Sequence, residues 1–167
     1  LAFSSISHLG WMTVIIIYNP KLTLLTFYLY CLMTSAIFLT LKTTKILKLS
    51  SMITAWTKIP SLTATLMLTL LSLAGLPPLT GFLPKWLIIQ ELTKQEMTST
   101  ATIIAILSLL GLFFYLRLAY CATITLPPNS SNYMKQWQIN KPVNFLTTTF
   151  TTLTITLLPL SPMSSPS

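Results

Sequence analysis

Acidic side chains are almost absent from this sequence, which holds no aspartate and only two glutamates, Glu91 and Glu96, among 167 residues. Charged residues make up 7% of the chain, whereas an ordinary soluble domain carries about 25%. Hydrophobic residues make up 53%, so the polar groups cannot cover the surface of the folded chain in water. The same composition excludes disorder, which needs low hydrophobicity and high charge. The composition therefore predicts a polytopic membrane protein.

Residues that bind metals or act as nucleophiles are also scarce. The chain has one histidine and two cysteines, and both Cys31 and Cys121 lie within apolar runs, where an unpaired packing role is expected. The sequence contains no metal-ligand set, no nucleophilic triad and no glycine pattern of a Rossmann or P-loop site. It therefore offers no recognisable metal, nucleophile or nucleotide site.

Positive charge is in excess, because nine lysines and one arginine give a net charge of +8. A nucleic-acid-binding domain gathers its lysines and arginines on one soluble face, but here they lie singly between apolar runs. Positively charged loops beside membrane spans explain the excess better. We therefore expect no nucleic-acid partner.

Five apolar runs are long enough for transmembrane helices, which need about 20 residues each. They cover residues 1–17, 22–41, 61–90, 98–123 and 143–158. A transmembrane barrel would show alternating segments of about 10 residues instead. The 26 threonines do not argue for strands, because a threonine hydroxyl within a span can bond a carbonyl three or four residues earlier. We predict an all-α fold with five transmembrane helices.

The first run begins at Leu1 rather than at a methionine. It has neither the basic segment nor the cleavage site of a signal peptide, and it resembles a membrane span that has been cut at its start. We therefore interpret the chain as the C-terminal piece of a longer protein.

The distribution of lysines predicts the orientation of the spans. Five spans place the loops 42–60 and 126–142 on one side, and these loops hold six lysines and no acid. The opposite side holds Lys21 and Lys94 together with both glutamates. By the positive-inside rule, the six-lysine side faces the compartment equivalent to the cytoplasm, and the C-terminal tail lies on the other side.

The third run contains a cluster of helix-breaking residues. Its 30 residues would form a continuous helix of about 45 Å, against about 30 Å of hydrocarbon. Each proline removes one backbone hydrogen bond, so the carbonyls of Leu73, Ala74 and Thr80 should lose their partners. Broken helices of this kind are typical of ion and proton transporters. The residues predicted to break this third span, centred on Pro77-Pro78, are Gly75, Pro77, Pro78, Gly81 and Pro84.

Lys85 follows directly after this break. A lysine near the bilayer centre costs about 2.5–3.5 kcal/mol on insertion scales. Gln90, at the end of the run, lies about 8 Å further along a helix, so the side chain could also extend to the membrane interface. The break beside Lys85 favours a functional role over this snorkelling.

His8 lies within the first run, with Ser4 and Ser5 one turn earlier on the same helix face. A lone histidine within a membrane is often a core residue with satisfied hydrogen bonds, but its imidazole titrates near neutral pH and would suit a proton relay. Both interpretations of His8 remain open. Arg117 lies near the end of its run, where snorkelling is the expected role.

Two stretches carry a resemblance to a known family. Residues 1–11 read LAFSSISHLGW, and residues 73–86 read LAGLPPLTGFLPKW. The first resembles the span that joins the two halves of the antiporter-like subunits of respiratory complex I, the mitochondrial NADH–ubiquinone oxidoreductase. The second resembles their second broken helix. Residues 115–118 and 134–137 are also similar, so the resemblance covers essentially the whole chain.

The resemblance implies a core subunit of that complex in the inner mitochondrial membrane. Such a subunit contributes to proton translocation coupled to electron transfer from NADH to ubiquinone, and it is built from inverted five-helix repeats. Residues 1–125 would form the second repeat with a truncated first span, 126–142 a loop, and 143–167 a C-terminal span and tail. The loops 42–60 and 126–142 would face the matrix, and the C-terminus would lie in the intermembrane space.

The resemblance also implies roles for two residues. In that family the lysine after the second break is a protonatable group of the proton channel, and the histidine of the joining helix lies on the hydrated central axis. The matching positions are Lys85 and His8. NADH, flavin, iron–sulfur clusters and ubiquinone would be bound by other subunits, so this chain would be a non-redox subunit with no cofactor. Its partners would be the other membrane-arm subunits and the lipid bilayer, and without the first repeat it could not pump alone.

Two rival hypotheses lead to different observations. A free-standing cation/proton antiporter would share these motifs, but only a respiratory subunit should co-migrate with NADH–quinone activity on purification. A purely structural membrane scaffold would leave proton pumping intact when Lys85 is changed to methionine.

Overall fold

The computed structural model of the chain describes residues 1–44, 48, 51, 60–124 and 145–156. Within these residues it contains six α-helices and no strand, so the all-α prediction is confirmed. The helices are α1 (Ala2–Ile15), α2 (Pro20–Thr44), α4 (Pro60–Ala74), α5 (Phe82–Lys94), α6 (Thr98–Ile124) and α7 (Phe145–Thr156).

Threonine and serine hydroxyls in these helices donate to backbone carbonyls one turn earlier. Buried examples are Thr26, which donates to the Thr23 carbonyl at 2.8 Å, and Thr69, which donates to the Leu66 carbonyl at 2.9 Å. The polar atom is thereby satisfied within its own helix, and the methyl group remains for packing. This explains how a chain so rich in threonine forms helices.

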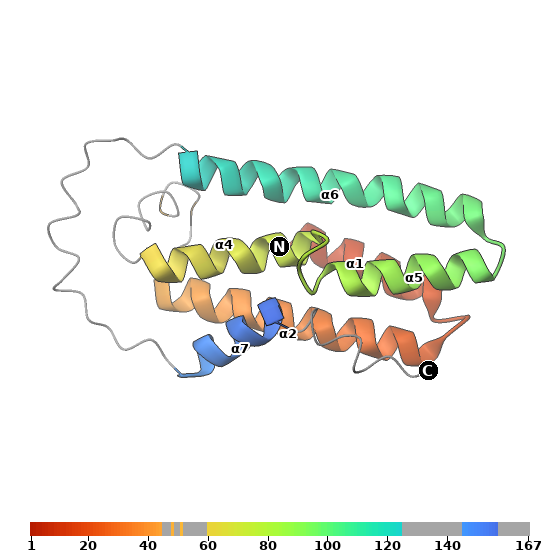
Figure 1. Cartoon of the computed structure of the whole chain (residues 1–167), viewed down its shortest axis with the longest axis horizontal. Helices are drawn as coiled ribbons and strands as arrows, with labels where there is room; N and C mark the ends of the chain where they lie inside the picture. Colours follow the sequence, from red (N-terminus) through yellow and green to blue (C-terminus); the bar gives the residue numbers. More distant parts are fainter. Residues whose placement is uncertain (45–47, 49–50, 52–59, 125–144, 157–167) are drawn as a thin grey trace, which may run out of the picture.

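The helices form an elongated bundle (Figure 1). α4 covers one half of its length and α5 the other, so the chain keeps its direction across residues 75–81. α6 returns alongside and contacts both, while α2 contacts both from another side. α1 covers one half of the bundle, where it packs on α2 and α5. α7 covers the other half, where it packs on α2 and α4.

Two clusters of buried apolar residues hold these halves together. One cluster joins α2, α4 and α6, and the other joins α1, α5 and α6. The first includes Met33, Leu66 and Leu73; the second includes Ile15, Ile88 and Leu92. The interruption between α4 and α5 therefore lies between two apolar clusters.

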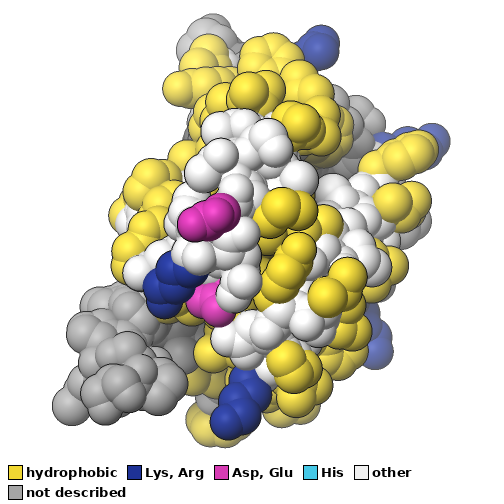
Figure 2. Space-filling model, turned by 90° about the vertical axis from the view of Figure 1, so that its right-hand side faces the viewer, with side chains coloured by type: hydrophobic (Ala, Val, Ile, Leu, Met, Phe, Trp, Pro, Cys, Tyr) yellow, Lys and Arg dark blue, Asp and Glu magenta, His cyan; other side chains and the backbone are white. Residues whose placement is uncertain are grey.

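Each end of the bundle brings together helix N-termini and helix C-termini. The α1–α2 and α5–α6 connections share one end (Figure 1), where Lys94 pairs with Glu91 at 3.7 Å. Figure 2 looks onto this end and shows acidic side chains flanked by lysines within an apolar surround. The C-termini of α2 and α6 and the N-termini of α4 and α7 lie at the other end (Figure 1).

Two described helices, α2 and α6, are each long and apolar enough to cross a membrane by length and composition. The remaining apolar runs correspond to shorter helices. The run at 61–90 is divided between α4 and α5, and α7 covers 12 residues of the run at 143–158.

Candidate functional site

The interruption between α4 and α5 is built from tight turns. α4 ends at Ala74, and the next residue, Gly75, has a φ of +88°, a conformation that glycine adopts without steric cost. Backbone hydrogen bonds then lead into α5, from Leu79 N to Leu76 O at 3.0 Å and from Phe82 N to Leu79 O at 3.1 Å. Of the five residues predicted to disturb a helix, Gly75, Pro77, Pro78 and Gly81 lie between α4 and α5, and Pro84 is the third residue of α5.

The prediction for the Thr80 carbonyl is wrong. This carbonyl accepts a hydrogen bond from the backbone N–H of Leu83 at 3.2 Å, which replaces the bond that Pro84 cannot make. Pro84 lies in the first turn of α5, where a proline is tolerated because its missing N–H would have no partner within the helix. Pro84 is therefore compatible with the start of α5.

Lys85 reaches back from α5 to the end of α4. Its Nζ donates a hydrogen bond to the Ala74 carbonyl at 2.7 Å, which is the carbonyl that Pro78 leaves without a helical donor. Lys85 is half-buried, and a Cβ added to Gly75 would lie 2.8 Å from its Nζ. The absent side chain of Gly75 is what gives the ammonium room at this carbonyl.

His8 shares a small cavity with Lys85. The cavity has a volume of about 20 Å³, enough for a single water molecule, and both side chains line it. The His8 ring lies on the ring of Tyr30, with centroids 4.9 Å apart and planes tilted by 36°. The lining residues come from α1, α2 and α5 and are His8, Trp11, Met12, Thr26, Tyr30, Met33, Pro84, Lys85 and Ile88.

The local serines do not act as the polar neighbours that the sequence suggested for His8. Ser4 donates to the Leu1 carbonyl and Ser5 to the Ala2 carbonyl, each at 2.6 Å. The aromatic and cationic neighbours of His8 come instead from α2 and α5. Sequence reasoning missed Tyr30 because nothing in the spacing along α2 separates it from the other aromatic residues of the spans.

Thr80 ties α7 to the interruption, which sequence reasoning also missed. Its hydroxyl donates to the Thr154 carbonyl, and both residues are buried. Gly81 allows the ends of α4 and α5 to approach, because a Cβ on Gly81 would collide with the backbone oxygen of Ser72. The sequence does not distinguish Thr80 from the other threonines of the chain. A glycine close to Pro77 and Pro78 does indicate a tight turn, so Gly81 was partly predictable.

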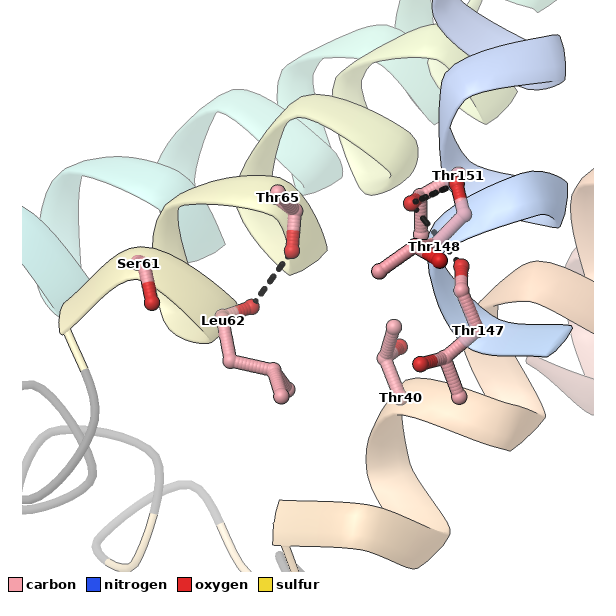
Figure 3. Close-up of a pocket in the computed structure, with 7 residues that line it drawn as sticks. All are labelled: Thr40, Ser61, Leu62, Thr65, Thr147, Thr148 and Thr151. Carbon is pink, nitrogen blue, oxygen red and sulfur yellow. Dashed lines mark hydrogen bonds between the residues drawn. The ribbon is translucent and has the colours of Figure 1, made fainter. Parts of the chain in front are cut away.

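A second cavity lies between α2, α4 and α7 (Figure 3). It has a volume of about 170 Å³ and is lined by Thr40, Ser61, Leu62, Thr65, Thr147, Thr148 and Thr151. The hydroxyls of Thr65 and Thr151 donate to carbonyls of their own helices, so the lining offers little free polarity. It contains no titratable side chain, which leaves the cavity of Lys85 and His8 as the stronger candidate for chemistry.

Metal binding finds no support in the described residues, which contain no group of three or more histidine, cysteine or acidic side chains that could hold an ion. The site at the interruption is thus made of one lysine, one histidine, tyrosine rings and backbone carbonyls. These groups can exchange protons and form hydrogen bonds.

Comparison with known families decides the classification. Residues 1–111 match the model of a family described as NADH:quinone oxidoreductase/Mrp antiporter, transmembrane region. The chain belongs to this family. Residues 112–165 match a second family model, which is described as the C-terminus of NADH dehydrogenase subunit 2. The resemblance seen in residues 1–11 and 73–86 is therefore confirmed.

Individual relatives agree with the family assignment. The chain is 75% identical to NADH-ubiquinone oxidoreductase chain 2 of Struthio camelus, 73% to that of Coturnix japonica and 71% to that of Gallus gallus. Each alignment spans 163 residues and covers 98% of this chain but 47% of the relative. The chain thus spans about half the length of the curated relatives that it matches.

Proposed function

We propose that this chain belongs to the membrane arm of an NADH–ubiquinone oxidoreductase of the inner mitochondrial membrane and carries a proton-translocating site. The observation that supports this best is the hydrogen bond from Lys85 to the Ala74 carbonyl at the interruption, beside the cavity shared with His8. Electron transfer, with NADH, flavin, iron–sulfur clusters and ubiquinone, belongs to other subunits. The names of the relatives and the family description support this assignment.

The physical case rests on how a free carbonyl and a charge are accommodated at membrane depth. An unsatisfied backbone group in hydrocarbon costs several kcal/mol, so irregular backbone survives there only against protein or a wet cavity. The Lys85 ammonium satisfies the Ala74 carbonyl, and the carbonyl in turn stabilises the charged form. Partial burial away from water opposes this stabilisation. The charged and neutral forms of Lys85 are therefore closer in free energy than in open water, and the side chain can lose its proton to a neighbouring acceptor and regain it.

The lengths of α4 and α5 favour one broken span. At 1.5 Å per residue, the 15 residues of α4 extend about 22 Å and the 13 residues of α5 about 20 Å. Neither helix crosses about 30 Å of hydrocarbon alone, but together they do. We therefore infer that α4 and α5 form one span, and that the apolar runs 1–17, 22–41, 98–123 and 143–158 form the other four.

The domain plan follows from these spans. We assign residues 1–125 to the second antiporter-like repeat and 143–167 to a C-terminal span with its tail. The loop 126–142 lies outside the described residues, as does most of 45–59. With the loops 42–60 and 126–142 in the matrix, the C-terminus lies in the intermembrane space. Other membrane-arm subunits and lipid would cover the exposed apolar side chains.

The test compares two lysines of α5 in the assembled complex. Lys85→Met should leave assembly intact and abolish the contribution of this site to protons translocated per NADH oxidised in proteoliposomes. Lys94→Met is the matched control, because Lys94 is exposed and pairs with Glu91 on the surface. Unchanged pumping by Lys85→Met would favour a structural scaffold, and failure to co-migrate with NADH–quinone activity would favour a separate antiporter.

Lys85→Arg sharpens this test because it keeps the positive charge. A guanidinium stays protonated in proteins, so the variant should assemble but pump poorly. A lysine that merely snorkels predicts the opposite, since arginine snorkels equally well. Near-normal proton pumping by Lys85→Arg would end the assignment of Lys85 as a proton carrier.

A further inference from the structure

The hydroxyl of Tyr115 on α6 is buried, and it is not one of the groups assigned above to the proton site. The residue is 6% exposed, and its Oη makes no hydrogen bond to any residue in the described part of the chain. Its ring packs edge-on against Phe114, with centroids 5.5 Å apart. Buried polar side chains nearly always have a partner in proteins, and ordered water often supplies it.

Tyr30 of α2 packs against the cluster of buried residues that contains Tyr115. Ser4 of α1 and Tyr30 are also the side chains that act electrostatically on the Tyr115 phenol, although neither makes a direct hydrogen bond with its hydroxyl. The Ser4 hydroxyl donates to the Leu1 carbonyl at 2.6 Å, which leaves its oxygen free to accept. Three hydroxyl groups from three helices are therefore available to hold a water molecule at the buried Tyr115 Oη.

Tyr30 connects this position to the site already described. Its ring lies on the ring of His8, and both residues line the cavity that Lys85 also lines. A line of groups able to form hydrogen bonds thus runs from Lys85 on α5 through His8 and Tyr30 to Tyr115. It begins at the interruption and ends on α6, the long helix of the bundle.

We propose that Tyr115 is a further residue of the proton pathway, holding a water molecule together with the hydroxyls of Ser4 and Tyr30. The proposal rests on the proposed function of Lys85 and extends that site to α6. A phenol O–H accepts a hydrogen bond on one side and donates on the other. A proton that enters the relay on one side leaves as a different O–H proton on the other, so Tyr115 ends each passage neutral and unchanged.

Removal of one oxygen atom tests the proposal. Tyr115→Phe keeps the ring and its packing, so the complex should assemble normally and oxidise NADH while translocating several-fold fewer protons per NADH through this site. Tyr120→Phe on the same helix is the matched control, because Tyr120 is exposed, and it should pump normally. A structural role alone would change assembly or thermal stability and leave the ratio of protons to NADH unaltered.

The variants separate failure of this inference from failure of the proposed function. Normal pumping by Tyr115→Phe beside lost pumping by Lys85→Met would overturn the role of Tyr115 only, whereas normal pumping by both would overturn both. Ser4→Ala should add little to Tyr115→Phe if the two hydroxyls hold the same water, and fully independent losses would contradict the shared water. A structure of the assembled complex should show a water about 2.7–3.2 Å from the Tyr115 Oη, and a dry hydroxyl would refute it.

Discussion

Gly81 shows how far the site depends on single atoms. Its position beside the Ser72 backbone oxygen leaves no room for a Cβ, and a backbone atom cannot rotate away as the end of a side chain can. Gly75 differs, because the atoms that a Cβ would meet there belong to the mobile end of Lys85. One glycine therefore permits the approach of two helices, and the other permits the approach of a charge to its acceptor.

We expect Gly81→Ala to force α4 and α5 apart. Overpacking typically costs about 1–3 kcal/mol, so the amount of assembled complex on native gels and its thermal stability should both fall. Gly111→Ala on α6 is the control, because nothing lies within 4 Å of its added Cβ. Alanine is favoured over glycine within a helix by up to about 1 kcal/mol, so this control should be neutral or slightly stabilising. Equal behaviour of the two variants would contradict the close approach at Gly81.

At the scale of helices, α7 helps to hold the segment between α4 and α5 in place. It packs on α2 and α4, and its Thr154 carbonyl accepts the hydrogen bond from Thr80. The segment between α4 and α5 is therefore held from within by its turns and from outside by α7. A substitution in α7 should therefore affect the segment between α4 and α5 even when Lys85 itself is unchanged.

Thr80→Val tests this connection with little change of shape. Loss of the hydroxyl leaves the buried Thr154 carbonyl without this donor, which typically costs about 1 kcal/mol. Backbone amides of α7 should then exchange with deuterium about fivefold faster in the assembled complex. Thr152→Val is the control, because Thr152 is exposed and donates only to Thr148 and Thr149 of its own helix. Unchanged exchange in both variants would show that Thr80 does not anchor α7.

The sequence predicted what depends on local chemistry. Pro77 and Pro78 predicted a break because each ring removes a backbone donor, and α4 ends just before them. The prediction for Thr80 failed because Leu83 closes a tighter turn, which depends on dihedral angles that the residue types do not specify. Pro77 and Pro78 therefore lie in the segment between α4 and α5, whereas the rule that each proline leaves a carbonyl without a partner failed at Thr80.

What the sequence could not predict is contact between helices. Lys85 bonds a carbonyl 11 positions earlier in the chain, and Thr80 bonds one 74 positions later. Tyr30 of α2 and Tyr115 of α6 meet at one buried cluster only when α2, α4 and α6 assemble around it. In spans that are apolar all round, hydrophobic periodicity gives little information on which face meets which partner.

At the scale of the whole molecule, the two ends of the bundle differ in charge. The described end with the α5–α6 connection carries Lys94, which pairs with Glu91. The connection from α2 to α4 and the connection from α6 to α7 both leave from the other end (Figure 1). These two connections, together with Lys42 in the last turn of α2, contain six lysines and no acidic residue. A membrane with a preferred side for positive charge should therefore fix the direction of the chain.

This asymmetry leads to a prediction of topology in the mitochondrion. Lysine-rich loops resist translocation across the membrane, so residues 42–58 should face the matrix and Ser167 the intermembrane space. Protease added to intact mitoplasts should remove an epitope at Ser167 and spare an epitope placed in the 42–58 loop. Detergent supplies the control, because it exposes both sides and should allow both epitopes to be cleaved. Loss of the loop epitope with survival of the C-terminal epitope in intact mitoplasts would reverse the orientation and defeat the use of lysine counts in this chain.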